Sequence, residues 1–206
     1  INTPKASYSI IGGSGNDTIT GGGGSDTIKG GDGADSITGG GAIDIIKWVA
    51  TTAAEMATET GSTAGTNVTF TAGSIGDKIS SWTSGTDKLY FDDALVTNAA
   101  GTEADTLLDI AKTGTVTNTA RFVHINNAVV GDAVNTSAGA VAILNGLTTT
   151  AVAIGDSFIV AMDNDTDTYL YLVEQVSAAD TIAAQDVTLI GVVNGTTIAN
   201  GDFVSF

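Results

Sequence analysis

The segment Gly12–Lys47, GGSGNDTITGGGGSDTIKGGDGADSITGGGAIDIIK, repeats one pattern every nine residues. Glycine holds the first and second positions of all four repeats and the fourth position of the first three. The sixth position is always aspartate and the eighth is always isoleucine, which gives Asp17, Asp26, Asp35, Asp44, Ile19, Ile28, Ile37 and Ile46. A flexible linker would account for the glycines but not for this register, so the segment is predicted to fold.

Each position of the repeat has a physical role. Glycine lets the backbone bend tightly with its carbonyls pointing inward, and aspartate adds a hard carboxylate oxygen. The last three residues form a short strand whose middle isoleucine faces inward. Two repeats then make one coil of a parallel β-roll, and stacked coils place each turn above the next turn but one. Two such turns enclose carbonyls and two carboxylates, an oxygen set that suits Ca²⁺ better than Mg²⁺. A dinucleotide- or phosphate-binding loop is disfavoured, because no GK[ST] sequence is present and no helix-forming run follows the glycines.

This pattern resembles the GGxGxDxUx nonapeptide of the RTX (repeats-in-toxin) calcium-binding family, as found toward the C-terminus of type I secreted bacterial surface-layer and RTX proteins. The resemblance implies Ca²⁺ shared by alternate turns, with Asp17 paired to Asp35 and Asp26 paired to Asp44. It implies supporting carbonyls from Gly13, Gly15, Gly22, Gly24, Gly31, Gly33 and Gly40.

Two positions depart from the pattern. Ala42 stands where the fourth repeat should have glycine, so we expect a strained turn there. Upstream, Ile10 keeps the inward position but Tyr8 replaces the aspartate, which predicts a capping coil without a ligand. We therefore expect about two well-formed calcium sites.

Composition limits the function classes. The chain has 206 residues, of which 42% are hydrophobic, enough for one large or two small domains. Its net charge of −16 repels nucleic acid and anionic membranes and attracts cations. Without cysteine it has no disulfides or thiolate metal sites. No apolar run approaches the roughly 20 residues of a membrane helix, and no signal peptide is recognised.

The sequence after the repeats predicts mostly strands. The fold class expected is all-β: a short parallel β-roll at residues 1–47, followed at residues 48–206 by a β-sandwich or β-roll-like domain with one or two small helices. Residues 48–65 are expected to be a short helix or an irregular connection, and Ala104–Lys112 and Ala138–Leu147 are predicted helices. The predicted strands are Asn67–Thr71, Lys78–Trp82, Lys88–Phe91, Ala120–Ile125, Ser157–Met162, Thr168–Glu174, Val187–Val193 and Phe203–Phe206.

Two further segments resemble parts of secreted RTX proteins. Gly76–Leu95 resembles a pattern often found after RTX repeats, through Asp77, Ile79, Trp82, Gly85, Asp87, Leu89 and Phe91. The ending NGDFVSF places an acidic residue before apolar ones, as type I export signals do, and it also fits a β-strand.

No catalytic motif is found. The single histidine, His124, excludes HExxH, and no Gly-x-Ser-x-Gly elbow is present. Paired carboxylates occur at Asp92–Asp93, at the end of a predicted strand, and Asp163, Asp165 and Asp167 share one turn. This turn is predicted to be solvated, with an additional calcium site as the alternative and catalysis as the weakest reading. Four aromatic residues are predicted to pack in the core or at an interface, with sugar binding as the alternative: Trp48, Trp82, Tyr169 and Tyr171.

Three functions fit these features. The first is an extracellular, non-enzymatic structural protein, a surface-layer or filament subunit that Ca²⁺ folds and assembles, with self-association and cell-surface polysaccharide as partners. The second is a Ca²⁺-triggered folding and type I secretion module of a larger secreted enzyme or adhesin from a Gram-negative-type bacterium. The third, ranked last, is an ice- or sugar-binding tip. In each, Ca²⁺ on the order of 10⁻⁴–10⁻³ M is expected to drive folding.

Overall fold

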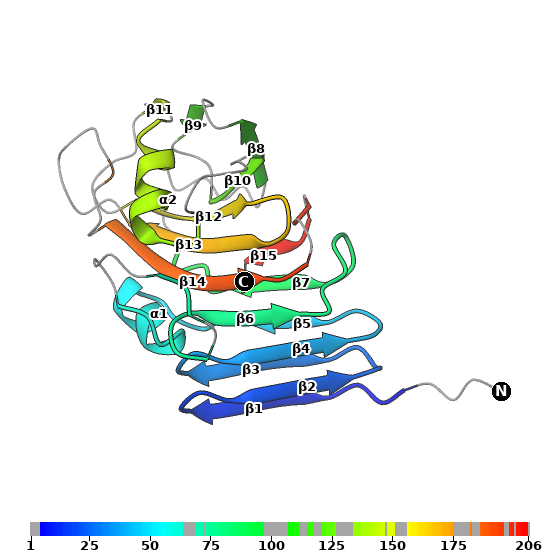
Figure 1. Cartoon of the computed structure of the whole chain (residues 1–206). Coiled ribbons are helices and arrows are strands. Elements are labelled where there is room, and N and C mark those ends of the chain that lie inside the picture. The colour runs from blue at the N-terminus through cyan, green and yellow to red at the C-terminus, as the bar shows by residue number, and fades with distance from the viewer. Residues whose placement is uncertain are drawn as a thin grey trace.

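Two β-sheets form the two sides of the lower part of the molecule, where strands are added to each sheet coil by coil, and one of the sheets continues to the upper end (Figure 1). The computed structural model describes residues 5–63, 69–71, 73–96, 107–111, 115–117, 121–126, 134–146, 148–150, 156–174, 182, 186–195, 198–199 and 201–205. The first sheet has the strand order β1-β3-β5-β7-β15, and the second has the order β2-β4-β6-β14-β13-β12-β10-β8. The all-β prediction is confirmed, and the described part of the chain includes two small helices.

The repeats form the predicted parallel β-roll. Successive strands alternate between the two sheets, and every pair of neighbours within the roll is parallel. The strands are β1 (Ser9–Ser14), β2 (Thr18–Gly22), β3 (Thr27–Asp32), β4 (Ser36–Gly40) and β5 (Ile45–Lys47).

Both sheets continue beyond the repeats without a break. After helix α1 (Ala53–Glu59), strand β6 (Asp77–Ser80) pairs with β4, and strand β7 (Lys88–Phe91) pairs with β5, both parallel. Strand β15 (Phe203–Ser205) then adds to β7. The predicted boundary at residue 47 therefore falls inside two continuous sheets.

The upper part of the molecule extends the second sheet. Its central hairpin, predicted around a polar turn, is an antiparallel pair, and the following strand joins it to β6. Helix α2 (Ser137–Leu144) packs over this hairpin (Figure 1). The remaining strands are β8 (Leu107–Ala111), β9 (Thr115–Thr117), β10 (Phe122–Asn126), β11 (Thr148–Thr150), β12 (Ser157–Asp163), β13 (Thr168–Glu174) and β14 (Val187–Val193).

The core of the roll is a pair of apolar columns. One column aligns the inward residues of the first sheet, and the other aligns those of the second, because equivalent positions pair in register. The first consists of Ile10, Ile28, Ile46, Leu89 and Phe203. The second consists of Ile19, Ile37, Ile79 and Val193. Above the roll, β12, β13 and β14 are buried on both faces, so successive residues contribute to two different clusters.

Several local predictions differ from the structure. The predicted helix Ala104–Lys112 is wrong: Leu107–Ala111 is strand β8, paired in parallel with β10, and the other four positions lie outside the described residues. Its local helix propensity is overridden by pairing at the edge of a large sheet. The predicted strand Asn67–Thr71 is also wrong, because Thr69 and Thr71 form only isolated bridges and positions 67–68 are outside the described part.

Other predictions agree within three residues at their ends. Ala138–Leu147 contains most of α2, whose first turn is capped by the Thr136 side chain. The strands β6, β7, β10, β12, β13, β14 and β15 match the corresponding predictions over their described residues. The segment 48–65 contains α1, in which the Thr52 side chain accepts from the N–H of Glu55.

Candidate metal centre

The turns of the roll stack so closely that glycine is required. Gly31 and Gly40 have φ of 114° each, in the region that disfavours side chains. A Cβ on either would overlap the carbonyl oxygen of the glycine one coil below, Gly13 or Gly22 respectively. Backbone carbonyls from successive coils therefore lie one above the other at the turns. Ala42 adopts φ 71°, which confirms the strained turn expected at that position.

The repeat aspartates form two hydrogen-bonded columns, which we call the aspartate ladders. On one side, the N–H of Asp17 donates to Asp35 Oδ1 at 2.8 Å, and the N–H of Asp35 donates to Asp77 Oδ1 at 2.9 Å. On the other side, the N–H of Asp26 donates to Asp44 Oδ1 at 2.9 Å. The structure thus brings together the pairs that the repeat spacing predicts.

The second ladder is longer than the repeats. The N–H of Asp44 donates to Asp87 Oδ1 at 2.9 Å, and at the lower end the N–H of Tyr8 donates to Asp26 Oδ1 at 2.7 Å. Tyr8 therefore occupies the aspartate position of a preceding coil without supplying a carboxylate, as expected.

The second oxygen of each repeat aspartate has a different environment. The Oδ2 atoms of Asp17, Asp26, Asp35 and Asp44 are all buried and have no hydrogen-bond partner in the protein. Buried carboxylate oxygens without partners are costly, and coordination of a cation is one of the few ways to satisfy them. The donor set of carboxylates and carbonyls is the set that Ca²⁺ prefers.

The first glycine of each repeat completes this arrangement. A Cβ on Gly12 would lie 2.7 Å from Asp17 Oδ2 and 2.5 Å from the Gly30 carbonyl oxygen. A Cβ on Gly21 would likewise lie 2.5 Å from Asp26 Oδ2 and 2.6 Å from the Gly39 carbonyl oxygen. These carbonyls border the same small spaces as the orphaned carboxylates. Sequence reasoning missed them as candidate ligands, although glycine at the first position of every repeat was the available signal.

Comparison with known protein families identifies this segment. The model of the RTX calcium-binding nonapeptide repeat, present in 4 copies, matches residues 11–46. Residues 11–46 are RTX repeats. Such repeats bind Ca²⁺, and the buried unpaired Oδ2 atoms fit that ion. No curated protein and no solved structure gives a significant match to the chain.

Burial raises the pKa values of the upper carboxyl groups of the aspartate ladders. It raises the pKa of Asp35 and the pKa of Asp44, because desolvation disfavours the charged form and neighbouring carboxylates add to it. The pKa of Asp77 is raised well above its usual range, chiefly by desolvation. Desolvation and the neighbouring carboxylates therefore disfavour the charged form of these three groups when no cation is bound.

At the upper end of each ladder, a protein donor binds the second carboxylate oxygen. Asp77 Oδ2 accepts from the indole N–H of Trp48 at 2.8 Å, and Asp87 Oδ2 accepts from the N–H of Thr83 at 2.7 Å. Both carboxylates are buried, yet both oxygens of each are satisfied within the chain. The signal for these positions is Asp-x-Ile at 77–79 and Asp-x-Leu at 87–89, which repeats the spacing of the RTX segment.

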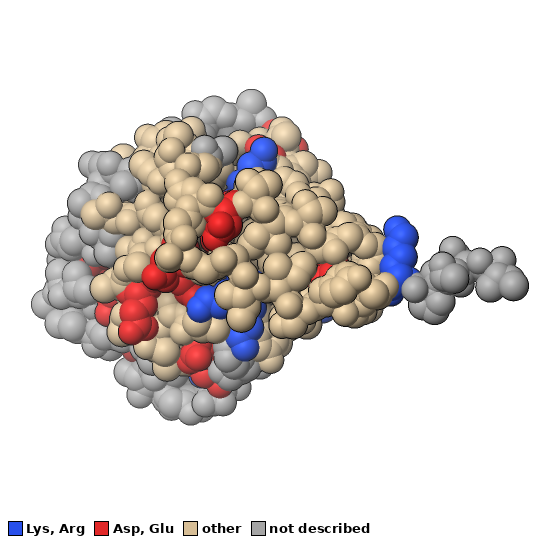
Figure 2. All heavy atoms as spheres, turned by 90° about the horizontal axis from the view of Figure 1, so that it is seen from below, with Lys and Arg blue, Asp and Glu red and all other residues tan. Residues whose placement is uncertain are grey.

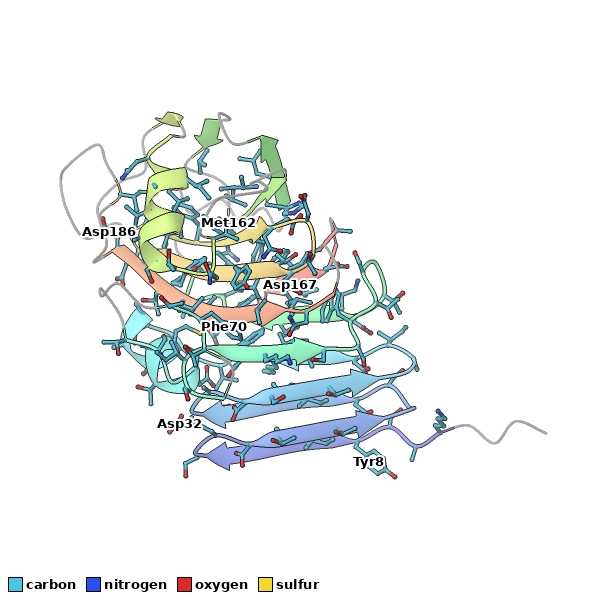
Figure 3. All side chains as sticks on the ribbon, in the orientation of Figure 1. Tyr8, Asp32, Phe70, Met162, Asp167 and Asp186 are labelled. Carbon is cyan, nitrogen blue, oxygen red and sulfur yellow. The ribbon has the colours of Figure 1, made fainter. Side chains whose placement is uncertain are left out.

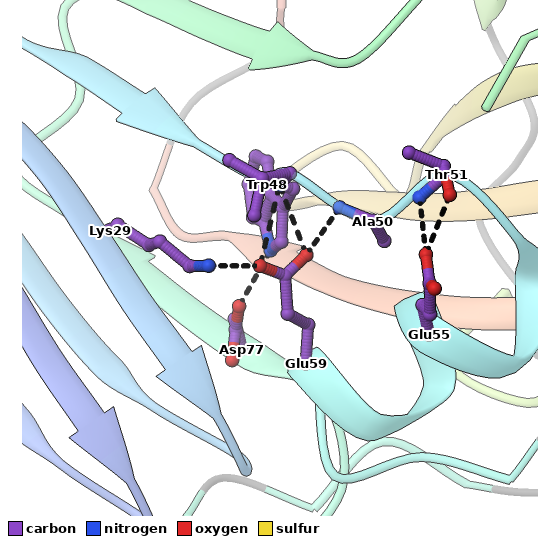
Figure 4. Close-up of polar contacts among 8 residues, drawn as sticks. Lys29, Trp48, Ala50, Thr51, Glu55, Glu59 and Asp77 are labelled. Carbon is purple, nitrogen blue, oxygen red and sulfur yellow. Dashed lines mark hydrogen bonds and ion pairs between the residues drawn. The ribbon is translucent and has the colours of Figure 1, made fainter. Parts of the chain in front are cut away.

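Helix α1 attaches to this end of the first ladder (Figure 4). Glu59 is buried and accepts from the backbone N–H groups of Val49 and Ala50 and from Lys29 Nζ at 2.9 Å. The Thr58 carbonyl oxygen also accepts from the N–H of Gly33, in the turn of the third repeat. Helix α1 and the coil that follows the repeats are therefore held to the RTX turns.

The other acidic candidates do not form a site. Asp163 binds His124 Nε2 at 2.7 Å and the Thr168 hydroxyl at 2.5 Å, all three buried. Asp167 accepts from Asn194 and from the N–H of Gly195 at the hairpin turn (Figure 3). Among the described residues, no three His, Cys, Asp or Glu side chains converge on one point.

The remaining sequence candidates are part of the packing. Asp93 pairs with Arg121 at 2.9 Å, and Asp92 accepts from the N–H of Ala94. The four aromatics weighed for sugar binding are all buried: Trp48, Trp82, Tyr169 and Tyr171. In the part of the chain described, no helix is long and apolar enough to cross a bilayer.

Proposed function

We propose that the chain is a calcium-dependent extracellular structural protein, a subunit of a surface layer or filament, which folds and assembles when Ca²⁺ binds its RTX repeats. The observation that carries this proposal is the row of four buried Oδ2 atoms without protein partners. A folded roll that keeps these carboxylates unpaired is poorly stable by itself, so folding is linked to the ion. Bound Ca²⁺ supplies the positive charge and the missing coordination.

The chain's own residues determine how this coupling spreads. Asp35 and Asp44 hold the N–H groups of the coil below, so loss of their geometry loosens two coils at once. Glu59 and Trp48 connect the first ladder to α1 and to the continuing sheets. Ordering of the RTX turns therefore supports the part of the molecule that carries β6 and β7.

Several features support a structural role rather than catalysis. The only histidine is bonded to Asp163 inside the core, and the described acidic pairs are occupied by protein donors. We therefore propose that the chain is not an enzyme. RTX proteins are typically secreted by type I systems, and we propose this route and a Gram-negative-type source here. A cell-surface polysaccharide would be the anchor of such a layer.

Electron microscopy with and without Ca²⁺ tests this function. The 206-residue chain is dialysed from EGTA into millimolar Ca²⁺, with Mg²⁺ as the matched control. Ordered sheets or fibres that form only in Ca²⁺ support the structural subunit. Folding in Ca²⁺ with no ordered assembly at any protein concentration contradicts it and favours the alternative, a folding and type I secretion module of a larger secreted enzyme or adhesin.

A further inference from the structure

The lower end of the roll presents two strand edges together. Strand β1 is the outer strand of the first sheet, and β2 is the outer strand of the second. Within the described residues no strand covers either edge, so each presents backbone groups that can pair with another chain. We call β1 and β2 together the roll edge.

The roll edge lacks the usual protections against such pairing. Proteins commonly guard open edges with charged residues or proline, but β1 (SIIGGS) and β2 (TITGG) have neither. Ile11, in β1, is 70% exposed. Tyr8, which directly precedes β1, is 57% exposed (Figure 3).

Charge also favours contact between two copies at this end. The chain carries a net charge of −16, which repels a second copy over most approaches. Residues 5–22 contain one lysine, Lys5, and one acidic residue, Asp17, so the end coil is formally neutral. Seen from this end, most of the described surface is uncharged, with a few acidic and basic side chains among it (Figure 2).

We propose that the roll edge is an interface with a second copy of this chain, an inference that rests on the proposed self-assembly. A second copy of the chain offers two strand edges at the same separation, which matches the roll edge. A twofold axis makes the contact isologous and brings the strands together antiparallel, so that both sheets continue into the partner. This contact closes a dimer, and a layer or filament needs an additional contact elsewhere.

Substitutions at the ninth repeat position test the interface with little risk to the fold. Ile11 and Thr20 occupy this position in the end coil, and interior coils already carry Lys29 and Lys47 there. We would make Ile11→Lys, Thr20→Lys and the double variant. Ile43→Lys is the control, because Ile43 is 52% exposed in a turn and gives the same change in charge.

Sedimentation velocity in millimolar Ca²⁺, over a wide range of protein concentration, gives the oligomeric state, and circular dichroism checks that each variant folds. We expect a concentration-dependent dimer for the parent chain and for Ile43→Lys. Each edge variant should weaken dimerisation at least about tenfold, because like charges meet across the twofold axis.

Two results would overturn the inference: a parent chain that stays monomeric, or a dimer that all variants retain. Ordered polymers that the edge variants do not affect would also overturn it while leaving the proposed function intact. A Ca²⁺-dependent dimer without polymers would support the inference and contradict the proposed lattice.

Discussion

The coils of the RTX segment and the coil that follows them have the same backbone arrangement, but their buried aspartate oxygens are satisfied in different ways. In both, an aspartate at the same place in the turn accepts the N–H of the coil below. In the repeats, the second carboxylate oxygen has no protein partner. In the next coil, Trp48 and the N–H of Thr83 supply the donors to Asp77 and Asp87. A repeat can therefore stay short and metal-dependent, whereas a metal-independent coil needs donors from additional chain.

Removal of Ca²⁺ should separate the two regions most strongly. In excess EGTA we expect strands β1 to β5 to lose amide protection. Without the ion, the carboxylates repel one another, and nothing offsets the free-energy cost of burying them unpaired. Strands β12 to β14, buried on both faces, should exchange more slowly. Hydrogen exchange with mass spectrometry measures both.

Mg²⁺ in place of Ca²⁺ is the control and should not restore protection, since it requires a stricter octahedral site. Unchanged exchange, circular dichroism and melting temperature in EGTA would show that the ladders are stable without the ion.

Replacement of one candidate ligand should have the next largest effect. Asp35→Asn keeps the acceptor for the Asp17 N–H but loses the charge at a fully buried, unpaired Oδ2. Loss of a supporting partner already costs metal affinity 10–100-fold, so we expect a loss of Ca²⁺ affinity on the order of 100-fold. Isothermal titration calorimetry measures the affinity and the stoichiometry.

The comparison variant is Asp77→Asn, in the metal-independent coil. It should leave the number and affinity of the calcium sites unchanged, because both oxygens of Asp77 already have protein donors. An equal loss of affinity in both variants would place Asp77 among the ligands.

The sequence predicted the roll and its ladders because one nine-residue pattern encodes both local geometry and stacking. Ile28, Asp26 and Gly22 are constrained by their own repeat, and the coils stack in register as a consequence. The protein donors that satisfy Asp77 and Asp87 at the ends of the ladders were not predictable in the same way. Trp48 reaches Asp77 across 29 positions, and nothing local to either residue indicates that contact. The helix predicted where strand β8 lies was wrong for a related reason, since the pairing of β8 with β10 is determined by the sheet.

Loss of one protein donor tests the metal-independent coil. Trp48→Phe keeps an aromatic ring near Phe91, 4.9 Å away between centroids, but removes the N–H that Asp77 Oδ2 accepts. A buried oxygen left without its donor costs about 1–3 kcal/mol. We expect a loss of that size in the free energy of unfolding by urea in saturating Ca²⁺.

Trp82→Phe is the matched control, because the Trp82 indole N–H is buried and already has no partner. The difference between the two variants isolates the hydrogen bond. If both lose the same stability, packing rather than the donor explains the effect at Trp48.

Acidification of the metal-free protein should act in the opposite direction to usual acid denaturation. The folded pKa values of Asp35, Asp44 and Asp77 are raised, so the folded state binds protons more tightly than the unfolded state. In EGTA, stability should therefore rise as pH falls through these raised values and level off near the unfolded value of about 3.9. Melting temperatures in EGTA across this range measure it, with the Ca²⁺-saturated protein as the control. Monotonic destabilisation of the EGTA sample with acid would contradict it.

The smallest expected effect is a gain at the one repeat that departs from the pattern. Ala42 has φ 71° where the other repeats carry glycine, and a left-handed conformation costs a non-glycine residue roughly 1–2 kcal/mol. Glycine recovers this cost but adds about 0.4–1 kcal/mol of unfolded-state entropy. Ala42→Gly should therefore stabilise the Ca²⁺-bound protein by roughly 0.5–1 kcal/mol in urea unfolding. Ala34→Gly, in a turn without positive φ, should destabilise it, and a loss of stability in both variants would show that the fourth turn gains nothing from glycine.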